Sequence, residues 1–67
     1  MIYPRIRDLR EDRDWTQEFV AEQLGIKQTT YSKYELGKIN IPAERLRKLA
    51  KLYSVTIDYL MERAEEK

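Results

Sequence analysis

An all-α fold of five short helices, forming one small domain, is predicted by three features of the sequence. Apolar residues recur at spacings of three and four through most of the 67 residues, as on the inward faces of amphipathic helices. Gly25, Gly37 and Pro42 interrupt this periodicity at short intervals. No run of alternating apolar and polar residues predicts a strand. We expect the domain to cover residues 1–62 and a frayed tail to cover residues 63–67.

The first helix is expected over residues 4–13. Pro4 is tolerated at its start because the first turn of a helix needs no backbone N–H donor. Apolar and basic residues then follow at the spacing i, i+3, i+4 and i+7, which places them on one side of the helix. This inward stripe consists of Ile6, Leu9, Arg10 and Arg13.

The second and third helices are separated by a very short turn. Thr16 is a good cap for a second helix over residues 17–24, and Gly25 supplies the left-handed residue that ends it. A third helix follows over residues 28–36 and ends at Gly37. The residues expected to point inward from these two helices are Val20, Ala21, Leu24, Tyr31 and Tyr34.

The fourth and fifth helices complete the predicted fold. The fourth begins at Pro42 and covers residues 42–53, and the fifth follows Thr56 and covers residues 57–63. Both contain apolar residues at helical spacing. We expect the fourth helix to bury Leu46, Leu49, Ala50 and Tyr53, and the fifth to bury Ile57, Leu60 and Met61.

The composition argues against several classes of protein. The chain has no cysteine and no histidine, so it lacks the thiolate, the usual general base and the commonest metal ligand. We therefore expect no enzyme activity, no metal site and no cofactor. Its start carries proline and charges where a signal peptide needs an apolar run, and no window approaches the roughly 18 apolar residues of a membrane span. We expect a cytoplasmic protein that does not enter a membrane.

Charge is distributed unevenly along the chain. The formal net charge is only +1, but residues 27–51 contain seven basic and two acidic side chains. Residues 58–67 contain four acidic and two basic ones. A solvated surface is the simpler interpretation of such a run, because charge alone does not identify a partner. A nucleic acid is the alternative that the basic segment allows.

The third predicted helix has a polar side that nothing in so small a chain is left to cover. On a helical wheel Tyr31 and Tyr34 point in one direction and polar residues point in the other. The short turn before this helix forces a steep crossing with the second helix, which is the helix-turn-helix arrangement. Glutamine, threonine and lysine suit the base edges of the DNA major groove, whereas the plain alternative is a solvated helix face. The outward set is Gln28, Thr29, Ser32, Lys33 and Leu36.

Two places beside this helix suit phosphates. Lys27 is a poor cap, so the first backbone N–H groups of the helix lack a side-chain acceptor from that position. Such a helix start favours anions. The loop after the helix carries Lys38 and Asn40, and Gln17 begins the neighbouring helix. Side chains of these types commonly contact DNA phosphates.

Arg10 lies on the apolar stripe of the first helix. A charge carried toward a core needs a partner, because its desolvation costs on the order of several kcal/mol. Glu35, on the inward flank of the third helix, is the natural candidate. We predict an Arg10–Glu35 ion pair that orients the third helix. The alternative is an Arg10 side chain that extends along the surface into solvent.

The middle of the chain resembles the repressor and Cro-type (xenobiotic response element type) helix-turn-helix family of phage and bacterial regulators. The resemblance is seen in TQEFVAEQLGIKQTTYSKYELGKINIP and continues through LRKLAKLYSVTIDYL, so that about residues 4–62 are covered. Taken in order and at unbroken spacing, the matching residues form a specific signal. They are Thr16, Gln17, Ala21, Gly25, Ile26, Tyr34, Glu35, Gly37 and Lys38.

This resemblance implies a transcriptional regulator, expected to be a repressor, that binds double-stranded DNA with its third helix in the major groove. It also implies that a homodimer can bind two half-sites about 34 Å apart. Lys27 departs from the family pattern of serine or threonine, so a phosphate contact is expected there in place of a cap. The residues carried over are Gln28, Thr29 and Lys33 for base reading, and Gln17, Lys27, Ser32, Lys38 and Asn40 for phosphate contacts.

Phe19, Leu52 and Tyr59 lie off the main apolar stripes of their helices. These residues either line the edge of the core or form a surface for a partner. The second interpretation supports a rival function, in which a protein-interaction module such as an antitoxin or a bridging factor uses the same fold. Dimer contacts, if present, are expected in the fifth helix and its tail.

Overall fold

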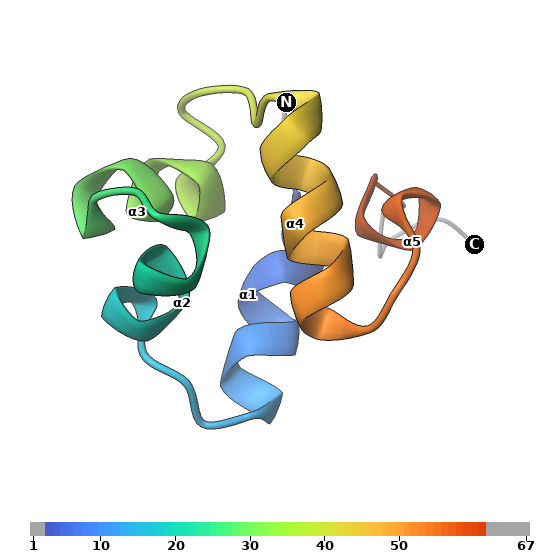
Figure 1. The fold of residues 1–67 in the computed structure, drawn as a ribbon, viewed down its shortest axis with the longest axis horizontal. Helices are drawn as coiled ribbons and strands as arrows, with labels where there is room; N and C mark the ends of the chain where they lie inside the picture. Colours follow the sequence, from blue (N-terminus) through green and yellow to red (C-terminus); the bar gives the residue numbers. More distant parts are fainter. Residues whose placement is uncertain (1–2, 62–67) are drawn as a thin grey trace.

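The computed structural model describes residues 3–61 and is helical, which confirms the all-α fold class (Figure 1). Over these residues it contains five helices and no strand. The predicted end of the fifth helix and the predicted tail lie outside the described residues. The helices are α1 (Pro4–Asp12), α2 (Gln17–Leu24), α3 (Gln28–Leu36), α4 (Ala43–Tyr53) and α5 (Ile57–Met61).

The observed bounds differ from the predicted ones by one residue at two places. Helix α1 ends at Asp12, because Arg13 has φ −99° and ψ 4° and lies just outside the helix. Pro42 is the N-cap of α4 rather than its first residue, and its ψ of 149° is extended. The residues that were predicted to point inward from α4 all lie within its observed bounds.

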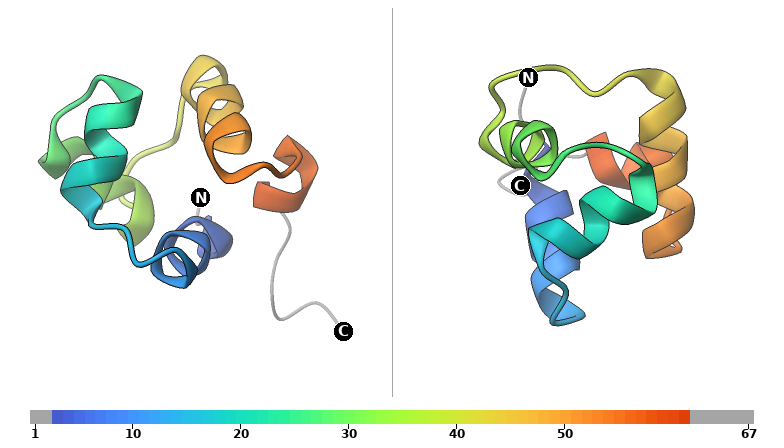
Figure 2. Two further views of the ribbon diagram at one scale, coloured as in Figure 1. Left: turned by 60° about the horizontal axis from the view of Figure 1, so that its bottom comes forward. Right: turned by 60° about the vertical axis from the view of Figure 1, so that its left-hand side comes forward.

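Helix α4 runs through the middle of the domain, with α2 and α3 on one side and α5 on the other (Figure 1). Helix α1 packs against α3, α4 and α5. The most extensive helix pair is α2 with α3. In the right-hand view of Figure 2, α3 is seen nearly end-on while α2 runs across the picture. The two helices therefore cross steeply, as the helix-turn-helix arrangement requires.

One hydrophobic core lies between the helices, and tyrosines are its largest members. Tyr31, Tyr34 and Tyr53 are each at most 1% exposed. All of the inward residues predicted for α2, α3 and α4 are buried. The buried residues are Tyr3, Ile6, Val20, Ala21, Leu24, Tyr31, Tyr34, Ile41, Leu46, Leu49, Ala50, Tyr53 and Leu60.

Helix α5 differs from its prediction. Leu60 is fully buried and Ile57 is half-buried, but Met61 is 43% exposed. The prediction that Met61 is buried is therefore wrong. The helix has five residues and lies at one side of the domain, so only one of its side chains reaches fully into the core (Figure 1).

Two core residues come from outside the helices. Tyr3 precedes α1 and Ile41 lies in the loop before α4, and both are buried. The backbone N–H of Ile41 donates a hydrogen bond to the hydroxyl of Tyr3 at 3.4 Å. Neither residue belongs to a periodic segment, so helical spacing could not identify them.

Helices α2, α3 and α4 end directly in a left-handed residue, and α1 is followed by one after Arg13. Gly25 and Gly37 have φ values of 72° and 73°, while Asp14 and Ser54 have values of 57° and 58°. After each helix the backbone N–H groups donate back to carbonyls of the last turn, as Val55 does to Ala50 at 2.9 Å. Glycine adopts this conformation freely, whereas a residue with a Cβ is strained there. The ends of α1 and α4 therefore carry strain that the ends of α2 and α3 avoid.

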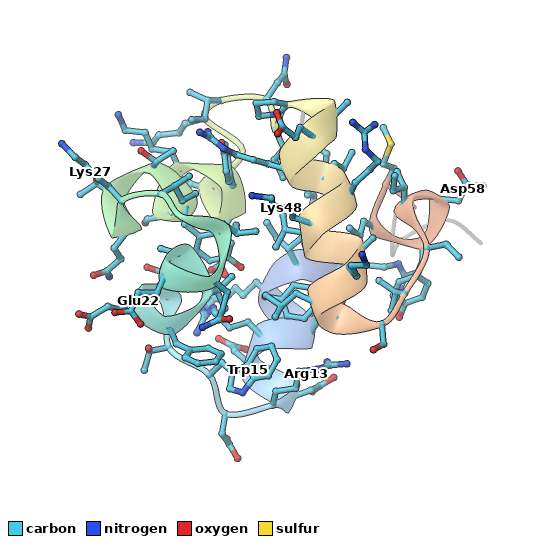
Figure 3. The ribbon with its side chains drawn as sticks, viewed as in Figure 1. Arg13, Trp15, Glu22, Lys27, Lys48 and Asp58 are labelled. Atoms are coloured by element: carbon cyan, nitrogen blue, oxygen red, sulfur yellow. The ribbon has the colours of Figure 1, made fainter. Side chains whose placement is uncertain are left out.

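Arg13 joins the end of α1 to the end of α4. Its Nη1 donates to the carbonyl of Leu9 at 3.0 Å, and its Nη2 donates to the carbonyl of Tyr53 at 2.8 Å. The guanidinium lies 5.3 Å from the ring centroid of Tyr53 and 5.7 Å from that of Trp15, beside which it is seen in Figure 3. The stripe pattern placed Arg13 inward without a role. The structure shows that it satisfies a terminal carbonyl of α4.

Two further features are absent from residues 3–61. No helix in that range is long and apolar enough to cross a membrane. No three acidic side chains in that range come together in a way that could hold a metal ion.

Candidate nucleic-acid interface

The turn between α2 and α3 is short and well defined. The backbone N–H of Gly25 donates to the carbonyl of Glu22 at 3.1 Å, and that of Ile26 donates to the carbonyl of Ala21 at 3.0 Å. A Cβ added at Gly25 would meet nothing within 4 Å, so the φ of 72°, rather than lack of space, favours glycine. Ile26 packs against the core and helps to set the direction in which α3 leaves the turn.

The outward side of α3 is polar and open. Gln28, Thr29 and Lys33 are exposed, and Ser32 is half-buried. Over residues 3–61 the structure gives Gln28, Thr29 and Lys33 no side-chain hydrogen bond and no ion pair. The two tyrosines of α3 occupy the opposite, buried side. The structure thus brings the predicted base-reading residues together on one free face.

The predicted phosphate-contacting residues lie at both ends of α3. Lys27 is the N-cap, makes no capping hydrogen bond through its side chain, and points away from the domain (Figure 3). The first N–H groups of α3 therefore have no acceptor from the usual position. After Gly37 ends the helix, Lys38 and Asn40 are exposed in the following loop. This arrangement gives α3 a polar side flanked by cationic or amide groups.

Three side chains join α1, α2 and α3 beneath this face. Arg10 Nε donates to Glu35 Oε2 at 2.7 Å, and Arg10 Nη2 donates to Glu35 Oε1 at 3.2 Å. Gln17 Nε2 also donates to Glu35 Oε1, at 2.9 Å. The side chain of Glu35 is 4% exposed and that of Arg10 is 13% exposed. The ion pair predicted from the sequence is thus present, and Gln17, a predicted phosphate-contacting residue, is hydrogen-bonded to the same carboxylate.

Gln17 keeps part of its hydrogen-bonding capacity despite this contact. Its side-chain amide has two N–H groups and a carbonyl oxygen, and the bond to Glu35 uses one N–H. The residue is half-buried at the first position of α2. Glu35 therefore holds Gln17 in place while leaving a donor that can face a ligand.

The surroundings of Glu35 keep its carboxylate charged. Burial alone would raise the pKa of Glu35, but hydrogen bonds from Arg10, Tyr31 and Gln17 outweigh it and lower the pKa below its ordinary value. Burial also raises the pKa of Tyr31, whose hydroxyl lies 3.2 Å from that of Tyr53. The tyrosine hydroxyls therefore stay neutral while the carboxylate beside them stays ionised.

Tyrosine hydroxyls attach α3 to α4. Tyr31 shares a buried hydrogen bond with Tyr53, and the hydroxyl of Tyr34 accepts from Arg45 Nη1 at 2.8 Å. Helical spacing predicted that Tyr31 and Tyr34 point inward but did not indicate these partners. A signal was available, because buried tyrosines need a partner for the hydroxyl and leucine would fill the space without one.

The basic segment over residues 27–51 divides between two surfaces. Lys27, Lys33 and Lys38 lie on or beside α3, where they surround the free face. A second group lies on the exposed side of α4 and lines a pocket that reaches the start of α5. The second group consists of Arg47, Lys48 and Lys51. Arg45, the seventh basic residue, donates to the hydroxyl of Tyr34.

The three off-stripe apolar residues each have a contact inside the domain. The ring of Phe19 lies 5.0 Å from that of Trp15, and Leu52 packs against the core. The ring of Tyr59 lies under the guanidinium of Arg5, at 4.3 Å from its centroid. Leu52 is half-buried, which fits the core-edge interpretation. Phe19 and Tyr59 keep 37% and 38% of their surface exposed despite these contacts, as the partner-surface interpretation expects.

The comparison with known proteins identifies the family. Residues 6–60 match the family described as Helix-turn-helix. The chain belongs to the Cro/C1-type helix-turn-helix family. The observed α2–turn–α3 unit and the five helices agree with this membership.

Several curated members of this helix-turn-helix family are similar to the chain. The cryptic phage CTXphi transcriptional repressor RstR of Vibrio cholerae is 43% identical over 97% of the chain and 59% of its own length. The HTH-type transcriptional regulator AnsR of Bacillus subtilis is 36% identical over 100% and 58%. The HTH-type transcriptional activator BcrR of Enterococcus faecalis is 42% identical over 85% and 28%. The chain thus spans less than two thirds of the length of these relatives.

Proposed function

We propose that this chain binds double-stranded DNA sequence-specifically, with α3 in the major groove, and regulates transcription, with repression as the expected outcome. The observation that carries the proposal is the free polar face of α3, which faces outward on a helix-turn-helix unit. The relatives supply further support, because their names include a transcriptional repressor and transcriptional regulators. An activator is also among them, so repression rests on the similarity to RstR.

The chemistry of the face suits base edges. The major groove is about 12 Å wide and admits one helix. Gln28 can form paired hydrogen bonds with adenine, Lys33 can donate to guanine, and Thr29 offers both a hydroxyl and a methyl group. Their side chains have no competing partner among the described residues, so binding need not break contacts within the domain.

Contacts to phosphates would fix the position of α3 in the groove. Lys27 at the start of the helix and Lys38 and Asn40 after its end can reach the two walls of the groove. Ser32 and Gln17 complete the proposed set. Glu35 holds Gln17 through a hydrogen bond of 2.9 Å. In this proposal the Arg10–Glu35 pair therefore also positions Gln17, a residue that contacts a phosphate.

A homodimer on two half-sites about 34 Å apart is part of the proposal, since helix-turn-helix dimers commonly bind half-sites whose centres lie one turn of DNA apart. We expect its contacts in α5 and the segment that follows. The three relatives named above come from bacteria, whose DNA lies in the cytoplasm, and we extend that location to this chain.

Selection of duplexes from a random pool tests the proposal. The expected result is a recovered consensus that the domain binds about 10³-fold more tightly than a shuffled duplex, with both affinities falling as salt rises. Fluorescence anisotropy on labelled duplexes measures both affinities. Failure to retain any duplex at low salt, with the domain shown to be folded by circular dichroism, would overturn the proposal.

A further inference from the structure

Leu36 is an apolar side chain that the domain does not cover. It is 62% exposed, more than any other large hydrophobic residue over residues 3–61. It is also absent from the set of partly buried residues that pack on the core. Phe19 and Tyr59, which are 37% and 38% exposed, each contact another side chain of the domain.

The position of Leu36 on α3 places it on the free polar face. It follows Thr29 by seven residues and Lys33 by three, and about two turns of helix bring Leu36 back to the direction of Thr29. Tyr31 and Tyr34 occupy the opposite side, where both are buried. Leu36 therefore continues the row of residues that the proposed function assigns to base reading.

A DNA duplex offers an apolar side chain few partners. In the major groove the only apolar group on a base edge is the C5-methyl group of thymine. The deoxyribose rings on the wall of the groove offer a second apolar surface, which is the same for every sequence. An aliphatic residue at the end of the row thus either reads thymine or contacts sugar without regard to sequence.

We propose that Leu36 reads a thymine methyl group, an inference that rests on the proposed function of α3. The row runs from Gln28 to Leu36, a distance of about 12 Å at about 1.5 Å per residue. This length corresponds to three or four base pairs at about 3.4 Å each. The thymine that Leu36 contacts therefore lies at most about four base pairs from the base that Gln28 reads.

Replacement of thymine by uracil tests this contact, because it removes only the methyl group. Each thymine of the selected duplex is replaced in turn, and the affinities of the wild-type domain and of Leu36→Ala are measured. The wild type should lose about fourfold in affinity at one position, as expected for one apolar methyl group left unburied. Leu36→Ala should bind the thymine and uracil duplexes equally at that position.

Ile39→Ala provides a matched control, because Ile39 is also aliphatic and 39% exposed but lies in the loop after α3. This variant should keep the wild-type preference for thymine over uracil. Circular dichroism checks that both variants are folded, and a wild-type scan with no uracil-sensitive position already overturns the claim.

The outcomes separate this inference from the proposed function. If the wild type selects a consensus but uracil changes its affinity nowhere, or changes it equally in Leu36→Ala, the inference is overturned while DNA binding stands. If the folded domain retains no duplex, the proposed function and the inference both fail.

Discussion

Arg10 and Glu35 join α1 to α3 through two N–H···O contacts, of 2.7 Å and 3.2 Å. The pair lies on the side of α3 that faces the domain, while the free face lies on the other side. Arg10 also donates to the backbone carbonyl of Trp15 at 2.9 Å, at the start of the segment that leads into α2. One arginine thus fixes both helices of the helix-turn-helix unit relative to α1.

Replacing Arg10 by methionine should lower the free energy of unfolding by about 3–5 kcal/mol, because Glu35 would remain buried without its partner. Urea unfolding followed by circular dichroism measures the change. Arg7→Met is the matched control, since Arg7 pairs with Glu11 on the same helix but both side chains are at least 51% exposed. The control should change stability by less than about 1 kcal/mol. Equal losses in the two variants would contradict the structural role of the pair.

Stability should depend on pH through Glu35. Its pKa is lowered in the folded domain, so its charged form stabilises the fold above the unfolded pKa of about 4.3, and this contribution is lost as pH falls through the folded value. Urea midpoints measured from about pH 6 to about pH 2 should therefore fall more steeply for the wild type than for Glu35→Gln. Parallel curves would show that other carboxyl groups cause the acid sensitivity.

Ser54→Gly should stabilise the domain by roughly 1 kcal/mol or less, because Ser54 has a φ of 58° at the end of α4, where glycine is not strained. The reverse change at an equivalent turn, Gly25→Ala, should destabilise by about 1–2 kcal/mol, since its φ is 72° and no neighbour offsets the strain. Thermal unfolding measures both. A stabilising Gly25→Ala would show that the turn can relax to another conformation.

Lys38→Ala should weaken binding to every duplex by a similar factor and reduce the slope of affinity against salt by about 1, because Lys38 is proposed to contact a phosphate. Lys51→Ala removes the same charge from the exposed side of α4 and should leave that slope nearly unchanged. Anisotropy titrations at several salt concentrations measure both slopes. A larger effect from Lys51 would place the DNA on α4.

Much of this fold could be predicted because the relevant residues are periodic or occupy turns. Gly25 and Gly37 mark helix ends, and Tyr31 and Tyr34 follow the helical spacing that identifies a buried side. Core residues outside the helices, Tyr3 among them, follow no such spacing. Met61 was wrongly placed in the core because periodicity alone does not show where a small domain ends.

The outward polar face of α3 could be predicted from the sequence, but most of the side-chain contacts that hold α3 in place could not. Arg10 could be paired with Glu35 because a charge on an apolar stripe needs a partner. The contact of Gln17 with the same carboxylate depends on how closely α2 and α3 approach, which no local pattern gives. The bond from Arg45 to Tyr34 is of the same kind, since it joins helices that are separated by a loop.

Base reading by the free face of α3 can be tested by comparing Gln28→Ala with the wild type. Both proteins are used to select duplexes from one random pool. Gln28→Ala should lose preference at one or two neighbouring positions, equivalent to about 1–3 kcal/mol of discrimination, and should keep the rest of the consensus. An unchanged consensus with uniformly weaker binding would contradict it.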